Sequence, residues 1–321
     1  MSGCAAPRIS ANSTQALRRR TQALRNKETL GLLLGLVGVM IFAATLPMTR
    51  LAVGDLGAWF LTAGRAAVAG IAAMLVLKLL RRPLPARAII GKLALAALCL
   101  VGGFPGFSGL AMQSVPAAHG AVVIGVLPLA TAAASALLHG ERPSAAFWIC
   151  GVAGAALIVL FALRQGAGGL SGGDLLLFGA VLSAAIGYTI SADLARMMPG
   201  WEVISWAVVL ALPVTLPAAL WLWPAHPEAV RATSWGAFAY ISLMSMYAGF
   251  FFWNAGLAMG GVARVSQVQL LQTFFSIGIA AALNGEPVGL ETLFFALAVA
   301  ATVFIGRLFR VSGAPAPGAA R

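Results

Sequence analysis

Long apolar segments, separated by short polar or turn-forming breaks, run along most of this 321-residue chain. A helix needs about 20 mostly apolar residues to cross the hydrocarbon core of a bilayer. On that scale the pattern predicts ten membrane-spanning helices, near residues 29–48, 58–80, 89–110, 117–138, 145–163, 174–193, 203–223, 235–258, 262–283 and 288–309. The expected fold class is therefore an all-α polytopic membrane protein.

The composition agrees with this picture. Hydrophobic residues make up 60% of the chain and charged residues only 9%, whereas a soluble domain carries about 25% charged residues. The formal net charge of +12 would suit a nucleic-acid-binding protein, but 11 of the 21 Lys and Arg residues lie in two clusters beside long apolar segments. Nucleic-acid binders need a basic stripe on an exposed face. We therefore expect the lipid bilayer as a partner, and no nucleic acid.

The basic residues also predict the orientation of the chain. If residues 1–28 form a cytoplasmic tail, the cytoplasmic segments hold 17 Lys and Arg residues, and the outer loops hold only Arg50, Arg164 and Arg231. Loops rich in Lys and Arg stay on the cytoplasmic side of a membrane. We therefore expect a basic tail at 1–28 and a short tail at 310–321, both on the cytoplasmic side of a bacterial inner membrane.

Two stretches in the middle of the two halves resemble each other. Residues 109–141 read GLAMQSVPAAHGAVVIGVLPLATAAASALLHGE, and residues 256–286 read GLAMGGVARVSQVQLLQTFFSIGIAAALNGE. Chance similarity between Ala- and Leu-rich helices is the alternative to duplication. Each half, 29–163 and 174–309, holds five predicted spans, and an odd number places the two halves in opposite orientations. Inverted repeats are a common plan of secondary transporters, with the substrate site between the repeats near the membrane midplane.

These residues resemble the EamA branch of the drug/metabolite transporter superfamily. That family has ten spans, two repeats and a proline thirteen residues before a Gly-Glu pair, as Pro128 stands before Glu141. In the second half the same spacing from Glu286 leads to Thr273 rather than proline, which puts a kink in span nine in doubt. The resemblance implies export or uptake of a small metabolite, and its motifs name no substrate.

Span nine carries the most polar face of any predicted span. At about 100° per residue, five side chains fall within an arc of about 120°: Ser266, Gln269, Gln272, Thr273 and Ser276. Amides that faced lipid would lack hydrogen-bond partners, so the face should point into the protein or a watery path. Two hypotheses follow, a substrate-lining face and interhelical hydrogen bonds that only hold the bundle together.

Further candidates for a binding site lie on other spans. Tyr247 and Asn254 are seven residues apart in span eight, Tyr188 lies in span six, and Thr45 lies near the end of span one. Aromatic side chains beside a few converging polar groups suit a small-molecule pocket. The alternative for each aromatic residue is ordinary packing.

Arg65 is the only basic residue well inside a predicted span, about 10 Å deep at 1.5 Å per residue. An arginine at that depth must pair, reach the surface or face a polar cavity. It could anchor a substrate carboxylate, or it could be a structurally paired or snorkelling residue. The family resemblance favours a structural role, because members often carry an arginine here.

The remaining chemistry narrows the function class. No Asp or Glu lies deep in a predicted span, His119 is the one candidate for proton coupling, and no GxxxxGK[ST] motif is present. We expect no cofactor, no metal and no catalysis. The leading hypothesis is a secondary-active or facilitative transporter of an amino-acid-like or organic-acid-like solute. A membrane-embedded enzyme, a channel and a non-transporting assembly partner are the alternatives, and the sequence leaves homo-oligomer formation open.

Overall fold

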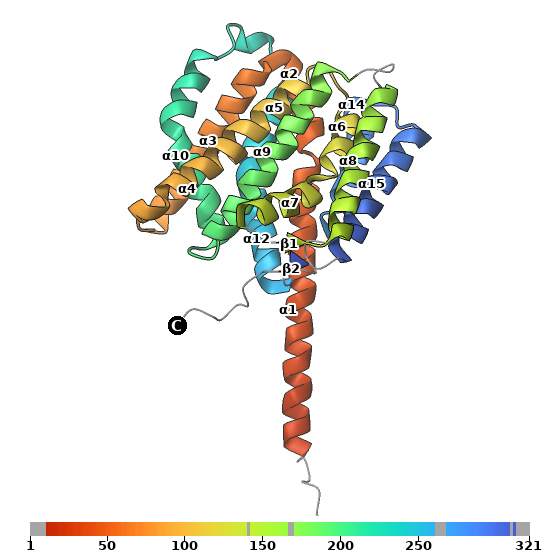
Figure 1. The fold of residues 1–321 in the computed structure, drawn as a ribbon. Helices are drawn as coiled ribbons and strands as arrows, with labels where there is room; N and C mark the ends of the chain where they lie inside the picture. The colour runs from red at the N-terminus through yellow and green to blue at the C-terminus, as the bar shows by residue number, and fades with distance from the viewer. Residues whose placement is uncertain (1–10, 140–141, 166–169, 261–267, 309–310, 313–321) are drawn as a thin grey trace, which may run out of the picture.

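The computed structural model describes residues 11–139, 142–165, 170–260, 268–308 and 311–312. The chain forms a bundle of helices, and α1 projects well beyond one end of it (Figure 1). The first five spans are built from α1 (Ala11–Ala43), α2 (Thr45–Leu56), α3 (Ala58–Leu79), α4 (Arg87–Ala97), η1 (Leu98–Gly103), α5 (Phe104–Ala111), α6 (Ala117–Ile124), α7 (Leu127–His139) and α8 (Ala145–Gln165).

The second half repeats this sequence of elements. It consists of α9 (Gly172–Leu194), α10 (Gly200–Trp221), the short η2 (Pro227–Ala229), α11 (Ala232–Ala239), η3 (Tyr240–Ala248), α12 (Gly249–Gly260), α14 (Leu271–Asn284) and α15 (Leu290–Leu308). Two-residue strands, β1 (Arg142–Pro143) and β2 (Val311–Ser312), pair antiparallel and join the two halves.

The predicted spans are confirmed as helices wherever the structure describes them, and residues 262–267 of span nine lie outside the described residues. Within the described residues, eight helical segments are long and apolar enough to cross a membrane, and α14 and α15 supply two shorter apolar helices. Span one departs most from the prediction, because α2 carries it to Leu56 rather than to about residue 48. Its polar residues are satisfied inside the protein: the Thr49 hydroxyl donates to the Thr45 carbonyl, and Arg50 donates to the carbonyl of Met112.

Helix packing follows a two-fold relation between the repeats. Spans two and seven pack together as α3 on α10, and spans five and ten as α8 on α15. Span one packs on span eight (α1 on α12), and span three packs on span six (α4 and α5 on α9). An axis that exchanges each span with the one five places later maps these pairs onto themselves or onto each other. The fold is therefore two inverted five-helix repeats, as predicted.

The irregular segments obey the same relation. Spans three and eight each contain a π-helical segment, η1 and η3. Span four is interrupted between α6 and α7, and span nine has a turn at residues 269–270 just before α14. The described part of span nine thus turns just before α14, without a proline at Thr273. π-helical segments and matched helix breaks are typical of transporter sites, because they open a helix toward a cavity.

Glycine permits the close crossing of α1 and α12. A Cβ atom added to Gly256 would lie 2.6 Å from the backbone nitrogen of Gly35. Any side chain there would force the two helices apart, so this contact between the repeats requires glycine.

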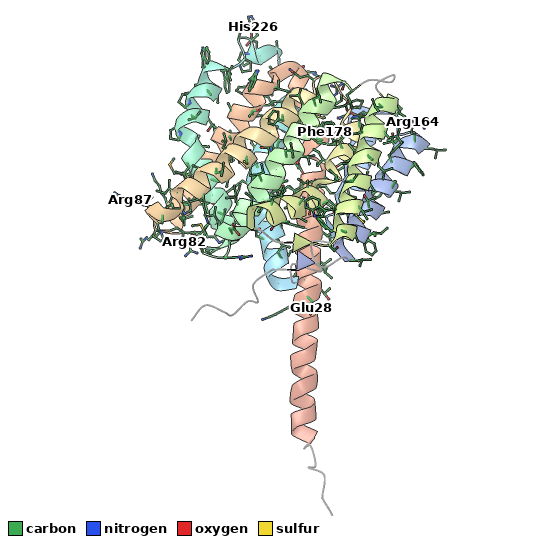
Figure 2. The ribbon with its side chains drawn as sticks, in the orientation of Figure 1. Glu28, Arg82, Arg87, Arg164, Phe178 and His226 are labelled. Atoms are coloured by element: carbon green, nitrogen blue, oxygen red, sulfur yellow. The ribbon has the colours of Figure 1, made fainter. Side chains whose placement is uncertain are left out.

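The two ends of the bundle carry different residues. The tail end is the one from which α1 projects, and Glu28, Arg82 and Arg87 lie there (Figure 2). The far end holds His226 and Arg164 (Figure 2).

Candidate functional site

A cavity of two adjoining compartments lies between the repeats. The narrow compartment has a volume of about 60 Å³ and the wider one about 550 Å³. Within the described residues, the lining comes from both repeats, and α8 and α15 contribute nothing to it. The side chains shared by the two compartments are Phe42, Leu100, Pro128, Tyr188, Phe250, Gln269 and Gln272.

Hydroxyl groups and one guanidinium line the narrow compartment. The Thr45 and Ser245 hydroxyls lie 2.7 Å apart, and Arg65 Nη2 donates to Ser245 Oγ at 3.4 Å. Ser276 Oγ donates to the Ala43 carbonyl at 2.7 Å. These side chains come from α2, α3, η3 and α14, so the compartment joins both repeats.

The structure brings most of the predicted polar face of span nine to the cavity. Gln269 and Gln272 are half-buried and line both compartments, and Thr273 lines the narrow one. Neither glutamine amide has a hydrogen-bond partner among the described residues. Ser266 lies outside the described residues. The amides of span nine thus meet cavity space, which is the geometry of a lining face.

Other predicted residues divide into two groups. Tyr188 lines both compartments, Thr45 the narrow one and Asn254 the wider one. Tyr247 does not reach the cavity, because its hydroxyl bonds to Ser205 Oγ on α10 at 3.0 Å. The prediction placed Tyr247 and Asn254 on one face of a helix. At the level of Tyr247 this face packs against α3 and α10, and only at Asn254 does the compartment open.

Ser245 and Phe42 are lining residues that the sequence interpretation missed. Ser245 bonds to both Thr45 and Arg65. A single serine in an apolar helix carries little signal, since its hydroxyl can bond to the backbone four residues earlier. Phe42 has the same appearance as any packed aromatic residue.

The wider compartment reaches the tail end of the bundle. Its lining includes Ala195, Gly200 and Leu257, which lie at the ends of α9, α10 and α12. α10 begins beside Arg82, to which its Glu202 is bound, and Arg82 marks the tail end (Figure 2).

At the far end, Glu286 joins the two repeats. Its two carboxylate oxygens accept hydrogen bonds from the backbone N–H groups of Ala117 and Ala118, each at 2.8 Å. These are the first N–H groups of α6, which have no partner inside the helix. Gly285 ends α14 in the left-handed region, with φ of 65°, and turns the chain so that Glu286 reaches α6. The Gly-Glu pair of the second repeat thus caps a helix of the first.

A buried pair also ties the repeats together at the far end. His119 Nε2 and Asp174 Oδ1 are 2.6 Å apart, and both side chains are almost fully buried. The imidazole stacks on the Phe161 ring at 4.9 Å. Asp174 also accepts from the backbone and hydroxyl of Ser171 at the start of α9. His119 belongs to span four and Asp174 to span six, so the pair crosses between the repeats.

An exposed ion pair adds a third contact. Arg231 Nε donates to Asp55 Oδ2 at 2.8 Å, and the Ser234 hydroxyl donates to the same oxygen at 2.6 Å. The hydrogen bond from Arg231 to the Asp55 carboxylate raises the pKa of that guanidinium. The Phe60 ring packs nearby on Trp223, Trp235 and Phe238 of the second repeat. The far end is therefore closed by contacts between the repeats.

The arrangement is suited to binding a small solute. Among the described residues, no group of three or more His, Cys, Asp or Glu side chains could hold a metal ion. The cavity offers hydroxyls, amides, aromatic faces and one guanidinium, all of which can hold a small solute without changing it.

Comparisons with known proteins agree with this geometry. The sequence profile of the EamA-like transporter family matches residues 29–163 and 171–307. A curated relative, "Uncharacterized transporter YdeK" of Bacillus subtilis (strain 168), is 43% identical over 284 residues, which cover 88% of this chain and 99% of the relative. A solved structure described only as "Crystal structure of protein" has a TM-score of 0.56 and 18% identity, over 88% of this chain and 97% of that one, and so shares the fold. The chain belongs to the EamA-like transporter family and is a multi-pass membrane transporter.

Proposed function

We propose that this chain is a secondary-active or facilitative carrier that moves a small amino-acid-like or organic-acid-like solute across a bacterial inner membrane. The observation that carries the proposal is the cavity between the repeats, which reaches the tail end and is closed at the far end. Rocking of two inverted repeats around such a cavity exposes it to each side in turn. Transporter-family membership supports the further inference that the chain catalyses no bond chemistry.

The orientation of the carrier follows from its charges. The tail end holds Arg82 and Arg87 (Figure 2), and 17 of the 21 Lys and Arg residues belong to the tails and loops assigned to that side. Basic loops favour the cytoplasmic side. The described conformation is therefore open toward the cytoplasm and closed toward the outside.

Reconstitution tests the proposal. The purified protein in liposomes is given radiolabelled amino acids and organic acids, with and without a pH gradient. We expect saturable flux of at least one solute class, and a rate that responds to the gradient if protons are coupled. Absence of flux for every solute, while thermal unfolding shows a folded protein, would contradict a carrier function.

A double variant tests the lining role of span nine. Gln269→Leu with Gln272→Leu removes both amides that line the cavity, so we expect flux to fall at least tenfold with little change in thermal midpoint. Gln113→Leu is the control, because Gln113 is an exposed glutamine outside the cavity. Unchanged flux in the double variant would assign the amides to packing.

A further inference from the structure

We infer that the narrow compartment binds the carboxylate of a monoanionic organic acid through Arg65, with the apolar body of that acid in the wider compartment. The inference rests on the proposed function and names its substrate class. It starts from a buried charge, that of Arg65, which no described carboxylate neutralises.

Arg65 is 3% exposed and lines the narrow compartment. Its guanidinium makes one hydrogen bond to a described residue, the 3.4 Å contact with the Ser245 hydroxyl, and its buried Nε atom has no partner. In the described part of the chain no carboxylate forms an ion pair with it. Burying an ion is costly unless a counter-charge and hydrogen bonds compensate it. The compartment therefore holds a positive charge that an anion would neutralise.

Neither a snorkelling role nor a structural role for Arg65 fits this geometry. A snorkelling side chain carries its charge to the membrane surface, but Arg65 is buried among helices and faces a cavity. A structural arginine satisfies its five N–H donors with carbonyls or carboxylates, and most of those of Arg65 are unused within the described residues.

The neighbouring groups favour an anion over a zwitterion or a cation. The described lining of both compartments contains no Asp or Glu, so an ammonium group would find no counter-charge. Gln269 and Gln272 offer amide N–H donors in the same compartment as Arg65. α7 begins at Leu127, which also lines this compartment, and the start of a helix carries partial positive charge. All of these features stabilise a carboxylate.

The wider compartment selects the rest of the solute. Its volume of about 550 Å³ lies in the range of small-molecule pockets. Phe42, Phe250 and Trp253 border it, together with Leu100 and Leu257. Such walls suit an aromatic or branched apolar body, and the carboxylate would sit at the narrow end.

The charge is also a property of one repeat only. Arg65 lies in span two, whereas span seven, its equivalent in the second repeat, holds Glu202 in its first turn and no basic residue. The helix packing and the irregular segments are the same in the two repeats. A structural requirement shared by both repeats would therefore place a basic residue in span seven as well, and none is there. A ligand that binds in one orientation would explain Arg65.

A matched ligand series tests the inference. Binding of radiolabelled phenylacetate to the purified protein is competed by phenylacetamide, phenylalanine and phenethylamine, which keep the ring and change the charge. We expect phenylacetate to bind at least about tenfold more tightly than the other three, because only it supplies an uncompensated carboxylate. Equal or tighter binding of the amide or the amine would overturn the inference.

Two variants identify the residue. Arg65→Gln should lose at least about tenfold in phenylacetate affinity, while Arg65→Lys should keep part of it. Arg164→Gln is the control, since Arg164 is exposed and outside the cavity. The thermal midpoint of Arg65→Gln should stay or rise, because an unpaired buried charge is removed. A large fall in that midpoint would assign Arg65 to structure and overturn the inference.

Binding and flux separate the two proposals. Phenylacetate binding that depends on Arg65, without flux of any solute, would support the anion site and contradict the carrier. Flux of neutral or zwitterionic solutes, without phenylacetate binding, would support the carrier and contradict the anion site.

Discussion

The two ends of the cavity differ. At the far end, helices of one repeat that line the cavity are hydrogen-bonded to helices of the other repeat. At the tail end, the wider compartment separates the helices that line it. Glu286 joins α14 to α6, and His119 joins α6 to α9. The tail end of the compartment is bordered by parts of α7, α9, α10 and α12. Within the described residues, the centre of the bundle is thus closed at one end only.

The two edges of the bundle, formed by α3 with α10 and by α8 with α15 (Figure 1), differ from the centre because each pair of helices is joined at both ends. Near the far end, Phe60 of α3 contacts the ring of Trp223, just after α10. At the tail end, Arg82, just after α3, binds Glu202 of α10 at 2.6 Å. α8 and α15 are joined by a surface ion pair at the far end and by the β1–β2 pairing beyond their other ends. We infer that the edges are pivots and the far-end contacts of the centre are a gate.

Locking the gate should have the largest effect. With the native cysteines replaced, a cross-link between Pro116→Cys and Glu286→Cys would hold α6 against the end of α14. We expect flux to stop, because the cavity could not open at the far end, and to return when a cleavable cross-link is reduced. The measurement is solute flux in liposomes before and after reduction.

The matched control is a cross-link at an edge. Arg164→Cys and Glu291→Cys lie across the 3.3 Å ion pair between α8 and α15. We expect near-normal flux after this cross-link. A block as complete as that at the gate would show that the edges also separate, and the pivot assignment would be wrong.

Breaking the buried contact between His119 and Asp174 should have the next largest effect, an opening of the far end. Asp174→Asn removes the charge opposite His119 but leaves an oxygen for Ser171. A hydrogen bond to a charged group contributes about 1.5–3 kcal/mol, so we expect the closed conformation to lose about that much stability relative to the open one. Modification of Ala118→Cys by an impermeant maleimide, added from outside, should become faster, because Ala118 is buried at the gate while these contacts hold.

The control for this variant is the other histidine–carboxylate pair of the far end. His226 and Glu228 are 3.2 Å apart, with side chains 80% and 72% exposed, and both lie in one loop. Glu228→Gln should leave the labelling rate unchanged. If both variants changed the rate equally, the effect would belong to surface charge and not to the contact between repeats.

Removing the Glu286 cap should have a smaller effect. Glu286→Ala deletes two charge-assisted hydrogen bonds to the start of α6, and we expect the closed state to lose about 1–3 kcal/mol. Maleimide labelling of Ala118→Cys and the thermal midpoint would measure the loss. Glu291→Ala, at an exposed carboxylate near the same loop, is the control and should change neither. If Glu286→Ala behaved like Glu291→Ala in both measurements, the hydrogen bonds of Glu286 to α6 would not be part of the gate.

The sequence could predict features that depend on the residues of a single helix. Ten spans follow from apolar length, because transfer of each helix into lipid depends on its own residues. The inverted repeat follows from the repeated segments and the odd number of spans. The amides of Gln269 and Gln272 were predictable as interior groups for the same reason, since lipid offers them no partner.

The missed features depend on contacts between helices. Tyr247 faces α10 because Ser205 supplies a partner there, and no periodicity reveals that partner. The end of span one at Leu56 depends on the Met112 carbonyl, which accepts from Arg50. The partner of Glu286 lies some 170 residues away in the chain. Local patterns therefore predicted the spans, whereas the contacts that form the gate could be identified only from the structure.

The smallest effect is expected at the exposed ion pair of the far end. Asp55→Asn removes the charge opposite Arg231, and exposed pairs contribute little because water and salt screen them. We expect labelling of Ala118→Cys to rise no more than about fivefold at low salt, and the difference from the unmodified gate to vanish at high salt. Glu202→Gln, which breaks the edge pair at the tail end, should leave labelling unchanged at any salt concentration. A larger, salt-independent rise in labelling with Asp55→Asn would make this pair a main part of the gate. A change in labelling with Glu202→Gln would mean that the α3–α10 edge moves together with the centre of the bundle.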